Sequence, residues 1–259
     1  MKNYFFISTY LPPISLAERP DIGFEAIKTL FKENLGSADY NQFNTLLTYL
    51  DVENFQKVLS GERVSHFGKF NQKDLDQLFV KMDGIPSFFT EFIEKFKDPD
   101  SALKNFQQLF TSFFDFACAS TSKFLQFYFR TEREIRILLA VYRAKQLNVD
   151  PLVSLQFEDD KGTFMAEVIA LKDAPVFDFP LKYQKLGEKL AKNPSDPLMQ
   201  FKIMNEYRYG NTIKFLEEEP FSIDSLMAYV QAYLIVENIF SLDEKIGGKN
   251  LNKMVTNRL

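Results

Sequence analysis

The sequence predicts an all-α protein, an elongated assembly of many helices, and three observations support this. Apolar residues recur at the i, i+3, i+4, i+7 spacing of a helix face along most of the 259 residues. The chain has 29 phenylalanines and no tryptophan, and long aromatic side chains at helical spacing suit the gaps between packed helices. Glycines, prolines and capping residues stand where the periodic segments end.

Domain organisation follows less directly from the sequence. Length alone permits one elongated domain or two compact ones. We expect a single elongated domain over residues 1–259, with weak internal helical repeats and helical sub-units at about 1–85, 86–180 and 181–259.

The N-terminal part is expected to hold one short extended segment and then helices. Tyr4 to Leu11 is rich enough in aromatic and β-branched residues to be extended, and Pro12-Pro13 prevents a helix from continuing through it. From Gly23 the period becomes helical up to a stop at Gly36, and Ser37 can cap the next helix.

Two further helix starts are expected before the middle of the chain. Asp51 is placed to restart a helix that ends at Gly61. Asn71 followed by Asp74 is a cap with an acidic residue in the first turn, and it predicts a helix to about Met82.

The middle of the chain is expected to form the buried centre. One helix face is apolar from Leu103 to Phe114, and a second apolar stripe runs from Phe124 to Tyr142. The weak helix formers Ser120-Thr121-Ser122 lie between the two stripes. Two packed helices and one long bent helix both satisfy this pattern.

The last part of the chain begins with its least regular segment. Residues 150–180 contain three prolines and the acidic run Glu158-Asp159-Asp160, and they are interpreted as a linker with one short helix. The helices expected here are Thr163–Leu171, Leu181–Lys192, one from Asp196-Pro197 to about Glu218, and one from Ser222 to about Ile246, which Gly247-Gly248 terminates.

Composition excludes several classes of function. A net charge of −4 and a pI of about 5.3 make nucleic acid a poor partner. The single cysteine, Cys118, fits a reducing compartment. The apolar run at the start is too short for a signal peptide, and no segment is long enough to span a bilayer. We expect a cytoplasmic protein that reaches a membrane only indirectly, through a complex.

No residue pattern predicts an enzyme, a cofactor or a metal site. His66 is the only histidine and is interpreted as an ordinary loop residue. The apolar surroundings of Cys118 disfavour a reactive thiolate, and the sequence lacks a Cys pair, a His pair and an EF-hand loop. Gly247-Gly248-Lys249 follows a helix and not a strand, so it is interpreted as a helix stop and not as a phosphate loop.

The helix expected from Phe124 to Leu147 carries the candidate partner interface. At about 100° per residue, the face opposite its core stripe combines arginines with large apolar residues, a composition typical of protein interfaces. A solvated charged face is the alternative. The residues of this predicted interface are Phe129, Arg130, Arg133, Arg136, Ile137 and Arg143.

Short motifs recur near the ends of long helical segments. Leu50-Asp51-Val52-Glu53-Asn54-Phe55 returns as Leu234-Ile235-Val236-Glu237-Asn238-Ile239, and Lys145-Gln146-Leu147-Asn148 returns as Lys249-Asn250-Leu251-Asn252. With Glu134-Ile135-Arg136 in the middle helix, this pattern resembles the threefold motif of the central-stalk subunit of V-type and A-type ATPases. Tyr4-Phe5-Phe6-Ile7, Ser8 and Leu11-Pro12 also resemble a family of uncharacterised bacterial proteins encoded alongside V-type ATPase subunits.

The resemblance implies a non-catalytic, all-helical adaptor. Such a protein would link the central shaft of a V-type ATPase to its membrane rotor ring and couple ATP turnover to ion transport. Two alternatives are a free-standing helical adaptor or chaperone for unrelated protein partners, and an enzyme whose active residues match no known pattern. A polar pocket with convergent carboxylates would favour the enzyme.

Overall fold

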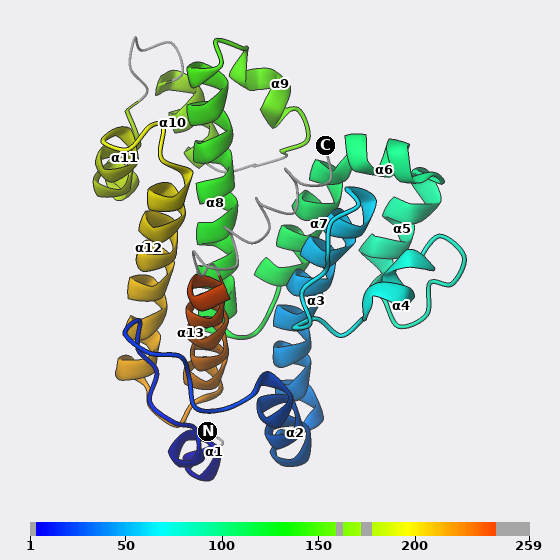
Figure 1. Cartoon of the computed structure of the whole chain (residues 1–259), viewed down its shortest axis with the longest axis vertical. Coiled ribbons are helices and arrows are strands. Elements are labelled where there is room, and N and C mark those ends of the chain that lie inside the picture. The colour runs from blue at the N-terminus through cyan, green and yellow to red at the C-terminus, as the bar shows by residue number, and fades with distance from the viewer. Residues whose placement is uncertain (1–3, 159–162, 172–177, 242–259) are drawn as a thin grey trace, which may run out of the picture. The chain divides into compact units, whose positions relative to one another are not determined.

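The computed structural model describes residues 4–158, 163–171 and 178–241, and within these residues it consists of helices, turns and loops without a strand (Figure 1). The prediction of an all-α fold is confirmed. The chain forms two compact units, one made of Met1–Asn34 together with Glu188–Leu259 and the other of Leu35–Gly187. This division does not coincide with the expected sub-units at 1–85, 86–180 and 181–259, because the two ends of the chain belong to one unit.

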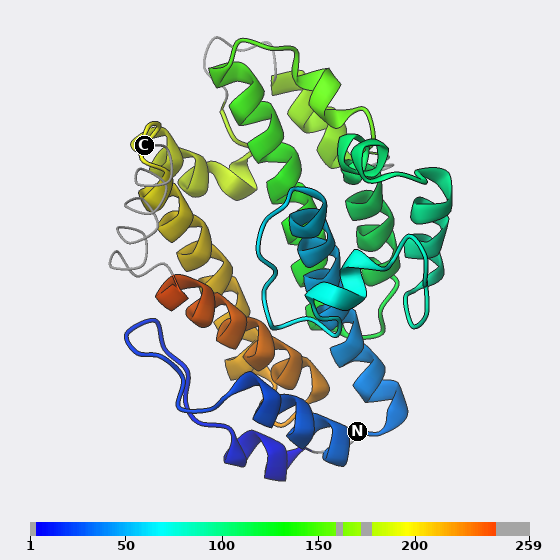
Figure 2. The same cartoon turned by 45° about the vertical axis from the view of Figure 1, so that its right-hand side comes forward.

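The continuous unit, Leu35–Gly187, is built around three long helices. These are α3 (Ser37–Leu59), α7 (Phe106–Cys118) and α8 (Lys123–Gln146). The short helices α4 (Gln72–Asp76) and α6 (Pro99–Lys104) pack on α3, α5 (Ser87–Lys95) packs on α7, and α9 (Pro151–Leu155) and α10 (Thr163–Leu171) pack on α8. Figures 1 and 2 show this grouping from two sides.

Aromatic rings fill the space between the three long helices. Phe113 of α7 lies edge-on to Phe129 of α8, with 4.9 Å between ring centroids. Tyr49 of α3 contacts both rings, at 5.3 Å and 5.4 Å. Phe113 and Phe129 are fully buried. Phenylalanine at helical spacing therefore fills the core of this unit, as the composition predicts.

The structure decides between the alternatives left open along this unit. Two helices are present where a single bent helix was possible, because the Ser122 hydroxyl accepts the Leu125 amide and caps a new helix, α8. The expected restart at Asp51 is wrong. Helix α3 runs through Asp51 without a break, and the Asp51 carboxylate instead accepts the Lys69 amide of the following loop at 2.7 Å.

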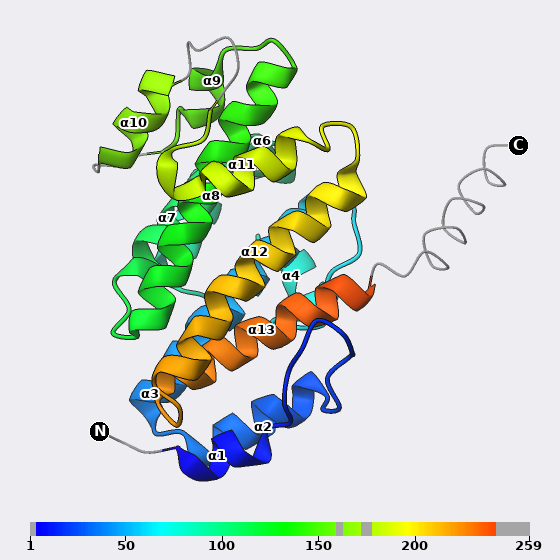
Figure 3. The same ribbon diagram turned by 90° about the vertical axis from the view of Figure 1, so that its left-hand side faces the viewer.

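The discontinuous unit combines both ends of the chain. Its helices are α1 (Phe5–Tyr10), α2 (Phe24–Asn34), α12 (Pro197–Glu218) and α13 (Ile223–Ser241), and α11 (Gln184–Ala191) contains the boundary between the units. Helices α12 and α13 lie side by side, and α2 runs along α13 (Figure 3), where Phe24 stacks on Tyr233. All residues from Ser225 to Val236 are buried, so this middle part of α13 is enclosed on every side.

The N-terminal segment is helical where an extended segment was predicted. Tyr4, Ile7 and Leu11 are buried at the i, i+3, i+7 spacing of one helix face, and this contact stabilises α1 against the strand propensity of its residues. Two tyrosine hydroxyls hold the loop that follows. Tyr229 donates to the Pro12 carbonyl at 2.9 Å, and Tyr209 donates to the Ile14 carbonyl at 3.0 Å.

The predicted helix ends are partly confirmed. Helix α12 starts at Pro197 with Asp196 as its cap, and Ser222 accepts the Ser225 amide at the start of α13, as expected. The Asn71 capping box exists, but α4 ends at Asp76 and not near Met82. The predicted terminator Gly247-Gly248 and the second copy of the Lys145–Asn148 motif, Lys249–Asn252, lie outside the described residues.

The first copy of that motif closes α8 by a Schellman arrangement. Asn148 adopts the left-handed conformation with a φ of 55°, the Val149 amide donates to the Ala144 carbonyl at 2.9 Å, and the Asn148 amide donates to the Lys145 carbonyl at 3.1 Å. Gly61 ends α3 in the same way, with a φ of 71° and a bond from the Glu62 amide to the Lys57 carbonyl. The left-handed backbone conformation therefore favours asparagine or glycine at positions 61 and 148.

Replacing Asn148 by valine should lower the free energy of unfolding by about 1–2 kcal/mol, because a β-branched side chain collides with the backbone in the left-handed region. Asn148→Gly is the matched control, and it should unfold at the same denaturant concentration as wild type or slightly above it. Guanidinium unfolding followed by circular dichroism measures both. Equal stability of the valine and glycine variants would contradict the role given to Asn148.

Candidate functional site

The predicted arginine face does not form one surface. Phe129 and Ile137 are 0% and 1% exposed and belong to the core, so the expectation that they contact a partner is wrong. Arg133 and Arg136 are half-buried, while Arg130 and Arg143 are exposed. The helix period predicts the direction in which each side chain points. It does not predict that segments from elsewhere in the chain cover part of this face.

Arg133 is covered by a network of acidic and amide side chains. Its Nε donates to Glu158 at 3.1 Å and its Nη1 to Asp115 at 2.8 Å, and the side chain of Glu158 is only 1% exposed. Burial by itself would lower the pKa of Arg133, but the carboxylates of Glu158 and Asp115 outweigh it and raise the pKa. Arg133 therefore holds a permanent positive charge that stabilises a buried carboxylate.

Arg136 extends the network toward α7. Its guanidinium lies 3.6 Å above the centre of the Phe110 ring, and Nη2 is 3.5 Å from the side-chain oxygen of Gln107. The Gln107 amide in turn donates to Glu158 at 2.8 Å. The two arginines thus connect α7, α8 and the segment after α9. We interpret their role as structural, within the protein, and not as contact with a partner.

An exposed apolar surface lies where α8 turns into α9. Within seven residues, Leu147 is 74% exposed, Val149 52%, Leu152 41% and Val153 65%. Arg143, one turn before Leu147, is also exposed. These five residues, Arg143, Leu147, Val149, Leu152 and Val153, are called the α8–α9 surface below. They combine an arginine with large apolar side chains, which is the composition used to predict an interface from the sequence. They lie at the C-terminal end of α8, in the turn after it and in α9.

The backbone of the α8–α9 surface is held on both sides. The Schellman turn at Asn148 fixes the end of α8, and the Asp150 carboxylate accepts the Leu152 amide at 2.9 Å with Pro151 in the first helical position of α9. Leu155 is buried, and Glu158 ties the following segment to Arg133. Figure 1 shows α9 beside the end of α8. The run Leu147-Asn148-Val149 was the available sequence signal for this surface, but Leu147 and Asn148 entered the prediction only as part of a motif at the helix end.

The recurring motifs place acidic residues that anchor distant segments. In the first copy, Asp51 and Asn54 bind the loop before α4, since the Ser65 amide donates to Asn54 at 2.8 Å. Glu134 of the middle helix accepts the Lys182 ammonium at 2.5 Å. Glu237 of the last copy accepts Arg19 Nε at 3.2 Å. Each copy therefore anchors a segment distant in the sequence, but the anchoring residues differ, since Asp51 corresponds to Ile235 in the last copy.

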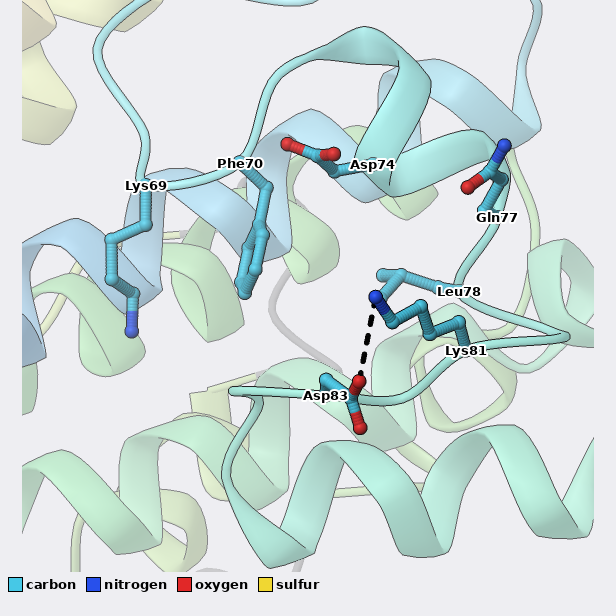
Figure 4. Close-up of a pocket in the computed structure, with 7 residues that line it drawn as sticks. All are labelled: Lys69, Phe70, Asp74, Gln77, Leu78, Lys81 and Asp83. Carbon is cyan, nitrogen blue, oxygen red and sulfur yellow. Dashed lines mark ion pairs between the residues drawn. The ribbon is translucent and has the colours of Figure 1, made fainter.

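A cavity of about 340 Å³ lies beside α4 (Figure 4). Its lining residues are Lys69, Phe70, Asp74, Gln77, Leu78, Lys81 and Asp83. Lys81 lies 3.5 Å from Asp83, and the Asp74 carboxylate accepts the Asn71 amide in the capping box. Burial lowers the pKa of Lys69, partly offset by Asp51, and its ammonium donates to Thr48. Since these charged groups already have partners within the protein, the cavity is a weaker candidate than the α8–α9 surface.

The other residues considered for chemistry occupy ordinary positions. His66 is a loop residue whose ring contacts Phe67, and burial raises the pKa of the Cys118 thiol more than Arg130 and Arg133 lower it. In the part of the chain that the structure describes, no three His, Cys, Asp or Glu side chains gather as a metal ion requires. No helix there is long and apolar enough to cross a membrane.

Comparison with known proteins gives one family. The family model described as "Protein of unknown function (DUF2764)" matches residues 1–259. An uncharacterised protein of Chlamydia muridarum is 27% identical over 241 residues, with 91% of each chain covered. An uncharacterised protein of Chlamydia pneumoniae is 25% identical over 252 residues, with 95% of each chain covered. No solved structure matches.

These matches overturn the resemblance to the central-stalk subunit of V-type and A-type ATPases. The matching family model covers the whole chain, and neither it nor the matched chlamydial proteins are described as such a subunit. The resemblance rested on short motifs, and acidic residues in them anchor other segments of this same chain.

Proposed function

The chain belongs to the DUF2764 family of proteins of unknown function, and from this premise we propose that it is a non-catalytic helical adaptor that binds a partner protein through the α8–α9 surface. The observation that carries the proposal is the exposure of four large apolar side chains within seven residues, on a turn whose backbone is fixed by hydrogen bonds. Burying one such side chain contributes about 1.5–3 kcal/mol, so this surface can supply the centre of an interface.

Rigidity and charge support the same proposal. A turn fixed by the Schellman bonds and by Asp150 loses little conformational entropy on binding. Arg143 stands at the rim, where it can pair with an acidic group of the partner and select the binding orientation. A partner with an apolar centre and an acidic rim is therefore expected.

The test is site-specific photo-crosslinking in cells. A photoreactive residue at Leu147 or Val153 should give a discrete adduct with another protein, because both side chains would face the partner. Val80, 89% exposed in the same unit, is the matched control position and should give none. Equal labelling at Val80, or no adduct at all, would show that the α8–α9 surface faces solvent.

Substitution should then weaken capture of the crosslinked protein. The double variant Arg143→Glu/Leu152→Ser is expected to reduce capture by tenfold or more, in line with interface hot spots of about 2 kcal/mol. Arg130→Glu, an exposed charge reversal on the same helix, should leave capture unchanged. Both variants should melt at the wild-type temperature, so a loss of capture reports the surface and not the fold.

The more specific expectation concerns the partner's identity. Contact with the central shaft or the membrane rotor ring of a V-type ATPase stays a prediction, without the subunit resemblance that first suggested it. Identification of a shaft or ring subunit in the Leu147 adduct, or its co-purification from gently solubilised membranes, would support it. An adduct with an unrelated protein would contradict this partner and leave the adaptor function in place.

A further inference from the structure

Helix α1 exposes aromatic side chains on the face opposite to its buried stripe. Phe5, Phe6 and Tyr10 are 58%, 62% and 62% exposed, while Tyr4, Ile7 and Leu11 are buried. A six-residue helix that is apolar on both faces is typical of a helix enclosed on both sides. Aromatic side chains of this kind are also the residues most enriched in binding hot spots.

The position of α1 is fixed by the loop between α12 and α13. The Tyr4 amide donates to the Phe221 carbonyl at 2.9 Å, and the rings of Phe5 and Phe221 lie 5.1 Å apart. Phe221 itself has a φ of 70°, an unfavourable conformation for a bulky residue that persists only where surrounding contacts impose it. Contacts within the protein therefore fix the position of α1, and of its exposed aromatic face, before any partner binds.

We propose that this face is a self-association surface, on which two copies of the chain pack their α1 helices antiparallel about a twofold axis. Phe6 and Tyr10 are four residues apart, and their rings lie 6.3 Å from each other on one side of the helix. In an antiparallel pair, Phe6 of one copy meets the partner's Tyr10, and Tyr10 meets the partner's Phe6. This reciprocity is what a twofold interface requires.

Charge and hydrogen bonding favour a second copy as the occupant. Helix α1 contains no charged residue, so two identical faces approach without repulsion between like charges. The Thr9 hydroxyl, beside the aromatic pair, already donates to the Phe5 and Phe6 carbonyls of its own helix, at 2.9 Å and 3.1 Å. Its burial would therefore leave no donor unsatisfied.

The available area sets the strength of this association. An aromatic side chain buries about 150–250 Å², so three of them at roughly 60% exposure offer about 270–450 Å² per copy and about twice that for the pair. Stable dimers bury about 1,200–2,000 Å² in total, and weak complexes lie below this range. A dimer that forms and dissociates with concentration is expected.

Sedimentation of the untagged 259-residue chain tests the proposal. From about 5 μM to about 500 μM the average mass should rise from 30.2 kDa toward twice that value. Phe6→Ser/Tyr10→Ser should raise the dissociation constant at least tenfold, and Val80→Ser, the matched exposed control, should not change it. Unchanged melting temperatures check that the variants fold. A wild-type chain that stays monomeric throughout would overturn the proposal.

A charge-swap pair identifies the occupant directly. The variants Phe6→Lys/Tyr10→Lys and Phe6→Glu/Tyr10→Glu should each be monomeric, and their mixture should form a heterodimer because each lysine meets a glutamate of the partner. A mixture that stays monomeric would contradict antiparallel α1 pairing. Binding of the monomeric wild-type chain to neutral phosphatidylcholine vesicles would also overturn it, since lipid would then be the occupant. Neither result bears on the α8–α9 surface, which lies on the other unit.

Discussion

Replacing Arg133 by glutamate is expected to destabilise the Leu35–Gly187 unit by about 3–5 kcal/mol, the range for breaking a buried ion pair. The substitution would place a third carboxylate beside Glu158 and Asp115, with Glu158 buried and deprived of its cation. Arg130→Glu and Arg143→Glu are the controls, and each should change stability by less than about 1 kcal/mol because both side chains are exposed, with the larger change at Arg143 in the last turn of α8. Guanidinium unfolding of the three variants measures the difference.

A double-mutant cycle separates the ion pair from simple loss of packing. Arg133→Met or Glu158→Met alone leaves one charge buried, whereas Arg133→Met/Glu158→Met removes both and should recover most of the lost stability. If Arg133→Glu unfolded at the wild-type denaturant concentration, the arginine would be solvated, as in the alternative of a solvated charged face.

Phe129→Ala is expected to lower the free energy of unfolding by about 3–5 kcal/mol, since it opens a cavity among tightly packed rings. Its ring contacts Phe113 and Tyr49 and has no exposed area. Phe116→Ala on α7 is the matched control, because Phe116 is 43% exposed and should contribute about 1 kcal/mol or less. Comparable unfolding of both variants would show that Phe129 is not a core residue.

The sequence predicted the helix starts at which a side chain caps the helix that directly follows it. Asp196-Pro197 and Ser222 begin α12 and α13 because a side-chain cap acts within three residues of its own position. The expected restart at Asp51 failed for the complementary reason. Its carboxylate is a good cap in isolation, but the amides it binds belong to Lys69 and Phe70, and the sequence gives no sign of that choice.

Contacts between distant segments explain what the sequence could not predict about the candidate site. Periodicity placed Arg133 and Arg136 opposite the core stripe of α8, yet Gln107, Asp115 and Glu158 cover that face from other parts of the chain. Tyr4 to Leu11 has the composition of a strand, and contacts along one helix face decide otherwise. For the arginines the local pattern was correct and only the covering segments were missed, whereas for Tyr4 to Leu11 the local composition predicted the wrong secondary structure.

The hydrogen bonds to the carbonyls of residues 12 and 14 join a segment that is synthesised early in translation to segments that are synthesised late. The two tyrosine donors, Tyr209 and Tyr229, follow their acceptors by 195 and 217 positions, and the whole Leu35–Gly187 unit emerges between them. At about 5–20 residues per second, the N-terminal segment leaves the ribosome roughly 10–40 s before its binding site exists. During translation the inserted unit can fold first, while the aromatic residues of α1 remain accessible to chaperones and proteases until α12 and α13 are complete.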